Sequence, residues 1–166
     1  MSNNIAIWTC TAAPSYYYQT GIAEKTNHLE IPENHKIYIC AQVRSSIAER
    51  IALYALVGLN EHSYPLYADV NANEWTDIYG FVPTRVTDKI IGKGKVCYGT
   101  TTANIGNITV GTTLEVKNFM MFDLTQMFGE ENEPTAEEFH NTFTSSYYPY
   151  DLGSSGTGIA PILYGG

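Results

Sequence analysis

The chain has 166 residues and a mass of 18.4 kDa. This length suits one domain of ordinary size and is too short for a second full domain. Its 44% hydrophobic and 13% aromatic residues can build a core, and this excludes disorder of the low-hydrophobicity, high-charge kind. Nine Lys plus Arg against 17 Asp plus Glu give a net charge of -8. Because that charge repels a phosphate backbone, we expect no nucleic-acid partner.

The cysteines and the start of the chain bear on its compartment. Cys10, Cys40 and Cys97 are an odd number whose spacings match neither a disulfide framework nor a zinc motif, so we expect reduced thiols in the core. The first eight residues lack the basic and apolar regions of a secretory signal, and no apolar run approaches the roughly 18 residues of a membrane span. The sequence predicts synthesis in a cytoplasm and no membrane insertion.

Short strands follow one another along the first 122 residues. Ile5–Trp8 is strand-like, and apolar residues alternate with polar ones over 36–44 and again over 74–82, where Pro83 ends the pattern. Residues 50–57 are nearly all apolar; a helical stripe is conceivable there, but Leu53, Tyr54 and Val57 favour a buried strand. Segments 95–98, 104–110 and 113–122 are further candidates, separated by glycines. This spacing is typical of a β-sandwich or barrel.

Helix signals are confined to the last 49 residues, which hold seven acidic residues and no Lys or Arg. Asp123 is placed to cap a short helix that Gly129 would end. Thr135 and Glu138 form a capping box directly after Pro134, which predicts a second helix over about 136–143.

The acidic segment also carries a family resemblance. Residues 117–152 contain an Asp-Leu-Thr, Phe-Gly, Asn-Glu-Pro-Thr, Glu-Glu-Phe and Tyr-Tyr-Pro-Tyr series that resembles a motif of phage tail and receptor-binding proteins. In those proteins the motif usually closes a jelly-roll sandwich similar to carbohydrate-binding modules. The resemblance implies an all-β fold: a single antiparallel β-sandwich (jelly-roll, galactose-binding-like) with two short C-terminal helices. It assigns structural roles to Asp123, Thr125, Phe128, Gly129, Glu133, Pro134, Thr135, Glu138 and Phe139.

We expect three parts along the chain: an N-terminal extended arm (1–34), the jelly-roll sandwich (35–152) and a C-terminal tail (153–166) made flexible by a glycine-rich joint. The acidic segment would be a compact lid that seals the two facing sheets. The termini would either pack on neighbouring subunits or cover the edges of their own sandwich.

Aromatic residues are the candidates for ligand contact, because a ring face with a polar edge suits a sugar ring. The candidates are Tyr16, Tyr17, Tyr18, Trp75, Tyr147, Tyr148 and Tyr150. The tyrosines suit a subunit interface equally well, and a place in the core is the other interpretation of Trp75.

Catalytic and metal signatures are missing from the sequence. The glutamates at 130–138 lack the spacing of a calcium loop and are better explained by helix N-termini and solvent. The four histidines have no zinc spacing, and no nucleophile elbow or phosphate-binding loop is present. We therefore predict no enzyme activity, no metal and no cofactor.

With the resemblance, these features predict a phage virion surface protein, made in the host cytoplasm and displayed as a tail-tip, fibre or capsid module. It would contribute to attachment to a host-surface glycan, with other virion proteins and further copies of itself as partners. The alternatives are a structural capsid decoration or head-fibre protein without a ligand, and a polysaccharide depolymerase that needs a carboxylate pair across a groove.

Overall fold

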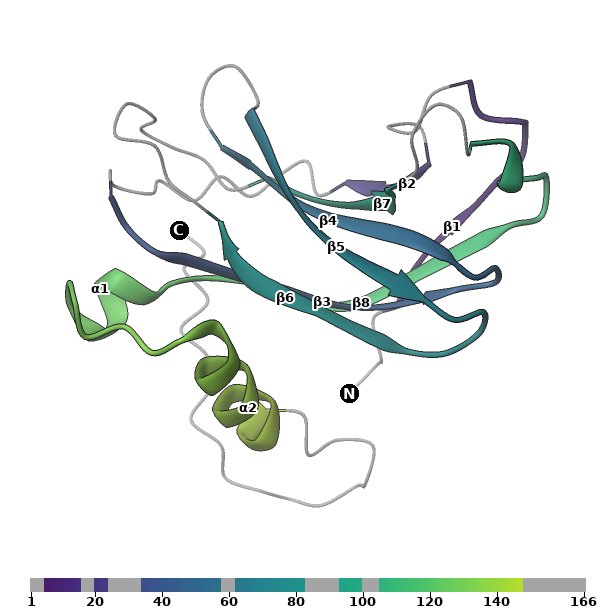
Figure 1. The fold of residues 1–166 in the computed structure, drawn as a ribbon. Coiled ribbons are helices and arrows are strands. Elements are labelled where there is room, and N and C mark those ends of the chain that lie inside the picture. Colours follow the sequence, from purple (N-terminus) through teal and green to yellow (C-terminus); the bar gives the residue numbers. More distant parts are fainter. Residues whose placement is uncertain are drawn as a thin grey trace.

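Two four-stranded antiparallel sheets pack face to face in the computed structural model, which describes residues 5–15, 20–23, 34–57, 62–82, 93–99 and 105–147 (Figure 1). The first sheet has the order β1 (Ala6–Thr9), β8 (Thr113–Asp123), β3 (Ile37–Ser45), β6 (Thr76–Val82). The second sheet has the order β2 (Gly21–Ala23), β7 (Lys93–Tyr98), β4 (Glu49–Val57), β5 (His62–Val70). The predicted jelly-roll β-sandwich is confirmed.

The core lies between the sheets and follows from the alternation in the sequence. In β3, Ile37, Ile39 and Val43 are fully buried and face the second sheet, whose β4 contributes Ile51 and Leu53. Residues 49–57 pair with β5 on one side and β7 on the other, so the strand interpretation of this apolar run is correct. A central strand buried on both faces has no polar face, which explains why its sequence lacks alternation.

The second sheet makes room for a large side chain from the first at Gly94 in β7. A Cβ atom built at Gly94 would overlap the ring of Phe119, which comes from β8. The hydroxyl of Tyr98 crosses the same interior and lies 2.8 Å from Ser45 Oγ and 2.9 Å from the carbonyl oxygen of Thr113. The two sheets are therefore joined by hydrogen bonds as well as by apolar packing.

The three cysteines are free and buried, as the sequence predicts. Burial raises the pKa of the Cys97 thiol to about 11, with Lys95 acting weakly in the opposite direction. A thiol with such a pKa stays protonated and unreactive at neutral pH, which fits a structural role.

Three element predictions need correction or extension. The predicted strand at 104–110 is not a strand in its described part, 105–110: this part holds a 3-10 helix, η2 (Ile105–Asn107), and leads into a turn in which Gly111 has φ +93°. Strands β2 and β5 are additional to those predicted. The second helix begins as expected but continues to Tyr147.

Part of the segment predicted as an N-terminal arm belongs to the sandwich itself. Strand β1 pairs with β8 at the edge of the first sheet, and β2 pairs with β7 at the edge of the second. In these stretches the chain covers its own sheet edges, so the sandwich includes residues before position 35. The predicted tail, 153–166, lies outside the described residues.

The two helices follow directly from β8 and lie against one sheet. Helix α1 (Leu124–Phe128) continues from the end of β8, and α2 (Ala136–Tyr147) packs on the outer face of the first sheet (Figure 1). The predicted lid therefore covers the outer surface of one sheet and does not seal the space between the two. None of the helices in the described ranges has the length and hydropathy needed to cross a bilayer.

Candidate functional site

The residues of the acidic motif mostly hold the lid in place. Asp123 caps α1 by accepting a hydrogen bond from the Gln126 backbone N–H, and its other oxygen lies 2.6 Å from Nδ1 of His35. Gly129 ends α1 with φ +88°, a backbone conformation that favours glycine. The cap, the stop and the contact with His35 together fix α1 at the end of β8.

Glu133 ties the turn between the helices to the start of β3. The Thr125 hydroxyl donates to Glu133 Oε1 at 2.6 Å and accepts from the Lys36 backbone N–H at 2.9 Å. The Lys36 ammonium lies 3.2 Å from Glu133 Oε2. The hydrogen bond from Thr125, more than the Lys36 charge, lowers the pKa of Glu133 to about 2. The carboxylate therefore stays ionised and links the turn between the helices to the residues before β3.

Thr135 and Glu138 form the predicted capping box, in which each satisfies the other's backbone donor. The Thr135 N–H donates to Glu138 Oε2 at 2.9 Å, and the Glu138 N–H donates to Thr135 Oγ1 at 3.2 Å. The bond from the Thr135 backbone is the main cause of a lowered pKa at Glu138. Pro134, directly before the box, precedes the helix that begins at Ala136.

A cluster of aromatic rings fills the interface between α2 and the first sheet. Phe139 lies 4.9 Å from Tyr38 and 5.5 Å from Phe122, centroid to centroid, and Phe143 lies 5.0 Å from Phe122. Phe128 approaches Phe139 edge-on at 6.1 Å but is 44% exposed. The motif residues therefore build a folded unit around this cluster, and their known contacts are with each other and with the sheet.

Trp75, a candidate for ligand contact or for the core, lies outside the core between the sheets. Its ring faces two cations on the outer surface of the first sheet: the Arg44 guanidinium carbon is 4.9 Å from the ring centroid and Lys117 Nζ is 4.3 Å from it. Arg44 is itself held by Glu115 at 2.6 Å. Stacking a ligand on this ring would compete with those cations.

The structure does not test the tyrosine candidates for ligand contact. Tyr16, Tyr17, Tyr18, Tyr148 and Tyr150 lie outside them, and Tyr147 is the last residue of α2, with its backbone alone described. These six positions remain predictions.

An exposed aromatic surface occurs instead on the outer face of the second sheet. Tyr67 in β5 is 49% exposed, and it pairs in register with Ala52 of β4. A Cβ atom built at Gly99 would lie 3.0 Å from the Tyr67 ring and 3.2 Å from the Ala52 Cβ. The ring thus lies across the sheet on a floor of small residues.

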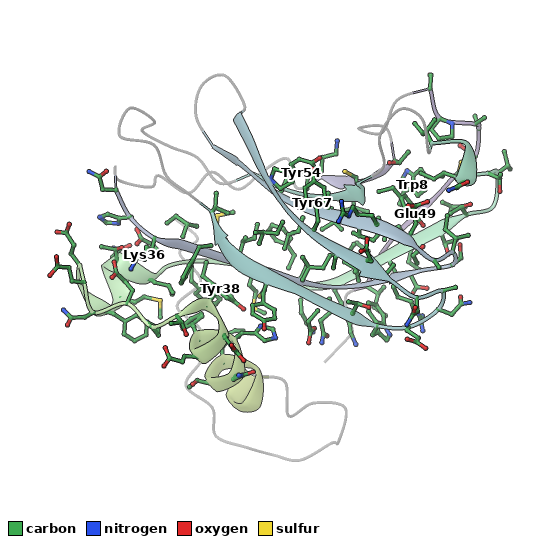
Figure 2. All side chains as sticks on the ribbon, viewed as in Figure 1. Trp8, Lys36, Tyr38, Glu49, Tyr54 and Tyr67 are labelled. Carbon is green, nitrogen blue, oxygen red and sulfur yellow. The ribbon has the colours of Figure 1, made fainter. Side chains whose placement is uncertain are left out.

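Charged groups flank this ring. The Arg50 guanidinium carbon is 5.2 Å from the Tyr67 centroid, and Arg50 Nε is 3.2 Å from Asp69 Oδ1. Tyr54, on the same face and 9% exposed, lies one diagonal step from Tyr67 in the strand register, and the two are labelled close together in Figure 2. We call Tyr67, Arg50, Asp69 and Tyr54 the Tyr67 surface.

The sequence held a weak signal for this surface. Residues 62–70 alternate in the β5 pattern, with Leu66, Ala68 and Val70 inward and Tyr67 outward, but Pro65 interrupts the run. Proline lacks an N–H donor, and an edge strand such as β5 tolerates it. If Pro65 is taken as the mark of an edge strand, residues 62–70 form one strand, and their alternation predicts that Tyr67 faces outward.

No protein-family model and no curated protein matches the chain. A solved structure described as "CBM4 structure and function" is similar, with a TM-score of 0.52 at 9% identity, covering 73% of this chain and 72% of that one. Weaker similarity is found to "Family 16 Carbohydrate Binding Module-2" (TM-score 0.40, 10% identity, 61% and 68% covered) and to "Structure of infectious bursal disease virus Gt strain" (0.34, 13%, 72% and 33%). The first similarity shows a shared β-sandwich fold.

Proposed function

We propose that the chain is a glycan-binding module of a phage virion surface and that the Tyr67 surface is its contact with the glycan. It acts by binding and not by catalysis. Other virion proteins and further copies of the chain are its proposed partners within the particle.

The geometry of Tyr67 is the observation that carries the proposal. Its ring is exposed and lies across the sheet, so that a sugar can stack on it from solvent. Arg50 approaches the ring face at 5.2 Å and pairs with Asp69, so these two side chains supply a donor and an acceptor for hydroxyl groups beside the ring. A stacked sugar would meet one cation here, farther from the ring centroid than either of the two cations at Trp75. An aromatic face beside a few polar groups is a common composition of a small-molecule site.

Two further observations support the setting. The fold is shared with a structure described as a CBM4, although at 9% identity the similarity concerns the fold alone. The placement on a phage particle rests on the acidic motif at 117–152, whose residues resemble those of tail and receptor-binding proteins. Repetition of a weakly binding module on a particle could raise its avidity by about 10² to 10⁴.

The test is binding of the purified full chain to host cell-wall polysaccharide fractions and to a glycan array. Tyr67→Ala should weaken any saturable binding about tenfold, the loss expected for one aromatic stacking contact. Tyr67→Phe keeps the ring and should bind nearly as the parent does. Met127→Ala is the matched control. Met127 is also exposed, at 54%, but it lies on α1, which packs at the first sheet and not at the second.

Each result has a distinct meaning. Binding that survives in Tyr67→Ala would place the glycan elsewhere on the molecule. Absence of binding to every fraction would favour the structural decoration or head-fibre alternative. Release of reducing ends from the polysaccharide would contradict the non-catalytic proposal and favour a depolymerase.

A further inference from the structure

We propose that His140 makes the docking of α2 on the first sheet sensitive to acid, so that the lid loosens when this histidine gains a proton. The proposal is independent of the Tyr67 surface. It rests on the position of one buried imidazole among groups that suit its neutral form.

His140 lies in the contact between α2 and the sheet, and only 7% of it is exposed. Its ring is stacked on Tyr79 of β6, with centroids 3.7 Å apart and planes within 4° of parallel. Its Nδ1 atom is 2.7 Å from the hydroxyl of Tyr38, which is fully buried in β3. The imidazole is therefore enclosed by the sheet on which the helix rests.

The contact with Tyr38 depends on where the protons are. In neutral His140 with its proton on Nε2, Nδ1 can accept the Tyr38 hydroxyl hydrogen. In the imidazolium both nitrogens are donors, so the Tyr38 hydroxyl must turn its hydrogen away and accept instead. Protonation thus reverses a buried hydrogen bond and places a charge where water has been removed.

Among the residues that the structure describes, the titratable groups near His140 only partly offset that charge. Asp77 of β6 lies 3.7 Å from His140 Nε2, but its side chain is 40% exposed and its attraction is screened by solvent. The other titratable groups of the sheet near the ring are Tyr38 and Cys40 on β3 and Tyr79 on β6, which lies opposite Cys40 in the register. On α2 itself, Glu137 precedes His140 by three residues and is exposed.

Burial outweighs the attraction of Asp77, so the pKa of His140 is lowered from its ordinary value. A histidine whose pKa is lower in the folded than in the unfolded state stabilises the fold above its ordinary pKa, near 6.5. That stability is lost as the pH falls through the folded value. Glu133 and Glu138, whose pKa values are lowered, keep their charges in this range and continue to hold the rest of the lid.

Amide hydrogen exchange of the full chain at about pH 7.5 and about pH 5 measures the effect directly, once each rate is expressed as a protection factor. We expect protection of the α2 amides to fall several-fold at the lower pH, while protection of the core strands β3 and β4 stays constant. An NMR titration of the His140 ring should give a pKa below the ordinary histidine value.

Three variants separate titration from packing. His140→Gln can still bond to Tyr38 but cannot titrate, so protection of α2 should not change between the two pH values. Asp77→Asn removes the charge that favours the imidazolium, so the acid-induced loss should grow while His140 stays in place. His62→Gln, the matched control at a histidine in β5 of the other sheet, should keep the parent response. Equal α2 protection at both pH values in the parent, or an equal loss in His140→Gln, would overturn the proposal.

Discussion

Both sheets carry aromatic side chains on their outer faces, but the two faces use them in opposite ways. On the first sheet, Tyr38 is fully buried and packs against Phe139 from α2. On the second sheet, Tyr67 is 49% exposed and rests on Ala52, beside Gly99. Rings covered by the chain's own helix stabilise the fold, whereas a ring fixed in place but exposed to water is available to a ligand.

The comparison also separates the motif from the candidate site. Most of the acidic motif residues are engaged in caps, hydrogen bonds and ring packing on the first sheet, as with Glu133 and Phe139. Tyr67 lies in β5, outside that motif. A long sequence motif can therefore mark residues that stabilise the fold, while the surface available to a partner has a weaker signal in the sequence.

The largest effect is expected from removing a ring of the lid. Phe139 is 8% exposed and contacts four aromatic rings, those of Tyr38, Phe122, Phe128 and Phe143, so Phe139→Ala removes packing from all four at once. The free energy of unfolding should fall by about 3–5 kcal/mol, the usual cost of truncating a buried phenylalanine. Chemical denaturation followed by circular dichroism measures this change.

Met127→Ala provides the control for that experiment. Met127 is 54% exposed on α1, and the change should alter the free energy of unfolding by no more than about 0.5 kcal/mol. A loss below about 1 kcal/mol for Phe139→Ala would mean that the lid contributes little to the fold, and the contrast between the two faces would disappear.

A smaller effect is expected at the capping box of α2. Thr135→Ala removes the oxygen that accepts from the Glu138 N–H and should lower the free energy of unfolding by about 0.5–2 kcal/mol. Thr135→Ser keeps the hydroxyl and should restore most of the loss. If the serine variant were as unstable as the alanine variant, the cap would not be the cause.

The contacts of Glu133 should affect how the free energy of unfolding falls at acid pH. Because the pKa of Glu133 is about 2 in the folded protein and ordinarily 4.5, its contribution is present above about pH 4.5 and is lost as the pH falls toward 2. Glu133→Gln should therefore flatten the loss of stability in that range. Glu130→Gln, an exposed neighbour in the same turn, should leave it unchanged. Identical acid limbs in the parent and Glu133→Gln would show that this carboxylate is not held by Thr125.

Much of the fold could be predicted from the sequence because local rules and tertiary packing agree there. Alternation identified β3 and β6, and capping residues identified the starts of α1 and α2. The direction in which the lid packs could not be predicted, because a capping box fixes where a helix begins and says nothing about which surface it covers. That choice depends on outward-facing rings such as Tyr38, which alternate with core residues in β3.

The roles of two glycines also differ between the sequence interpretation and the structure. Gly94 and Gly99 look like turn residues in the sequence, but Gly94 lies within β7 and Gly99 directly after it, and each leaves space for a ring, Phe119 and Tyr67 respectively. The residue that needs the space is distant in sequence in both cases. Sequence alone therefore gave no means of linking Gly99 to Tyr67, and with it the candidate site.

The smallest effect on stability, and the sharpest on the candidate site, is expected at Gly99. A valine there would push the Tyr67 ring from its place, since even a Cβ atom lies 3.0 Å from it, so glycan binding should weaken about tenfold while the free energy of unfolding changes by about 1 kcal/mol or less. Gly106→Val is the matched control, because a Cβ atom at Gly106 meets nothing within 4 Å. Titration calorimetry with the polysaccharide fraction that the parent binds measures the first quantity, and thermal unfolding measures the second. Undiminished binding by Gly99→Val would show that glycan binding does not depend on the position of the Tyr67 ring. It would contradict the proposal that the outer face of the second sheet contacts the ligand.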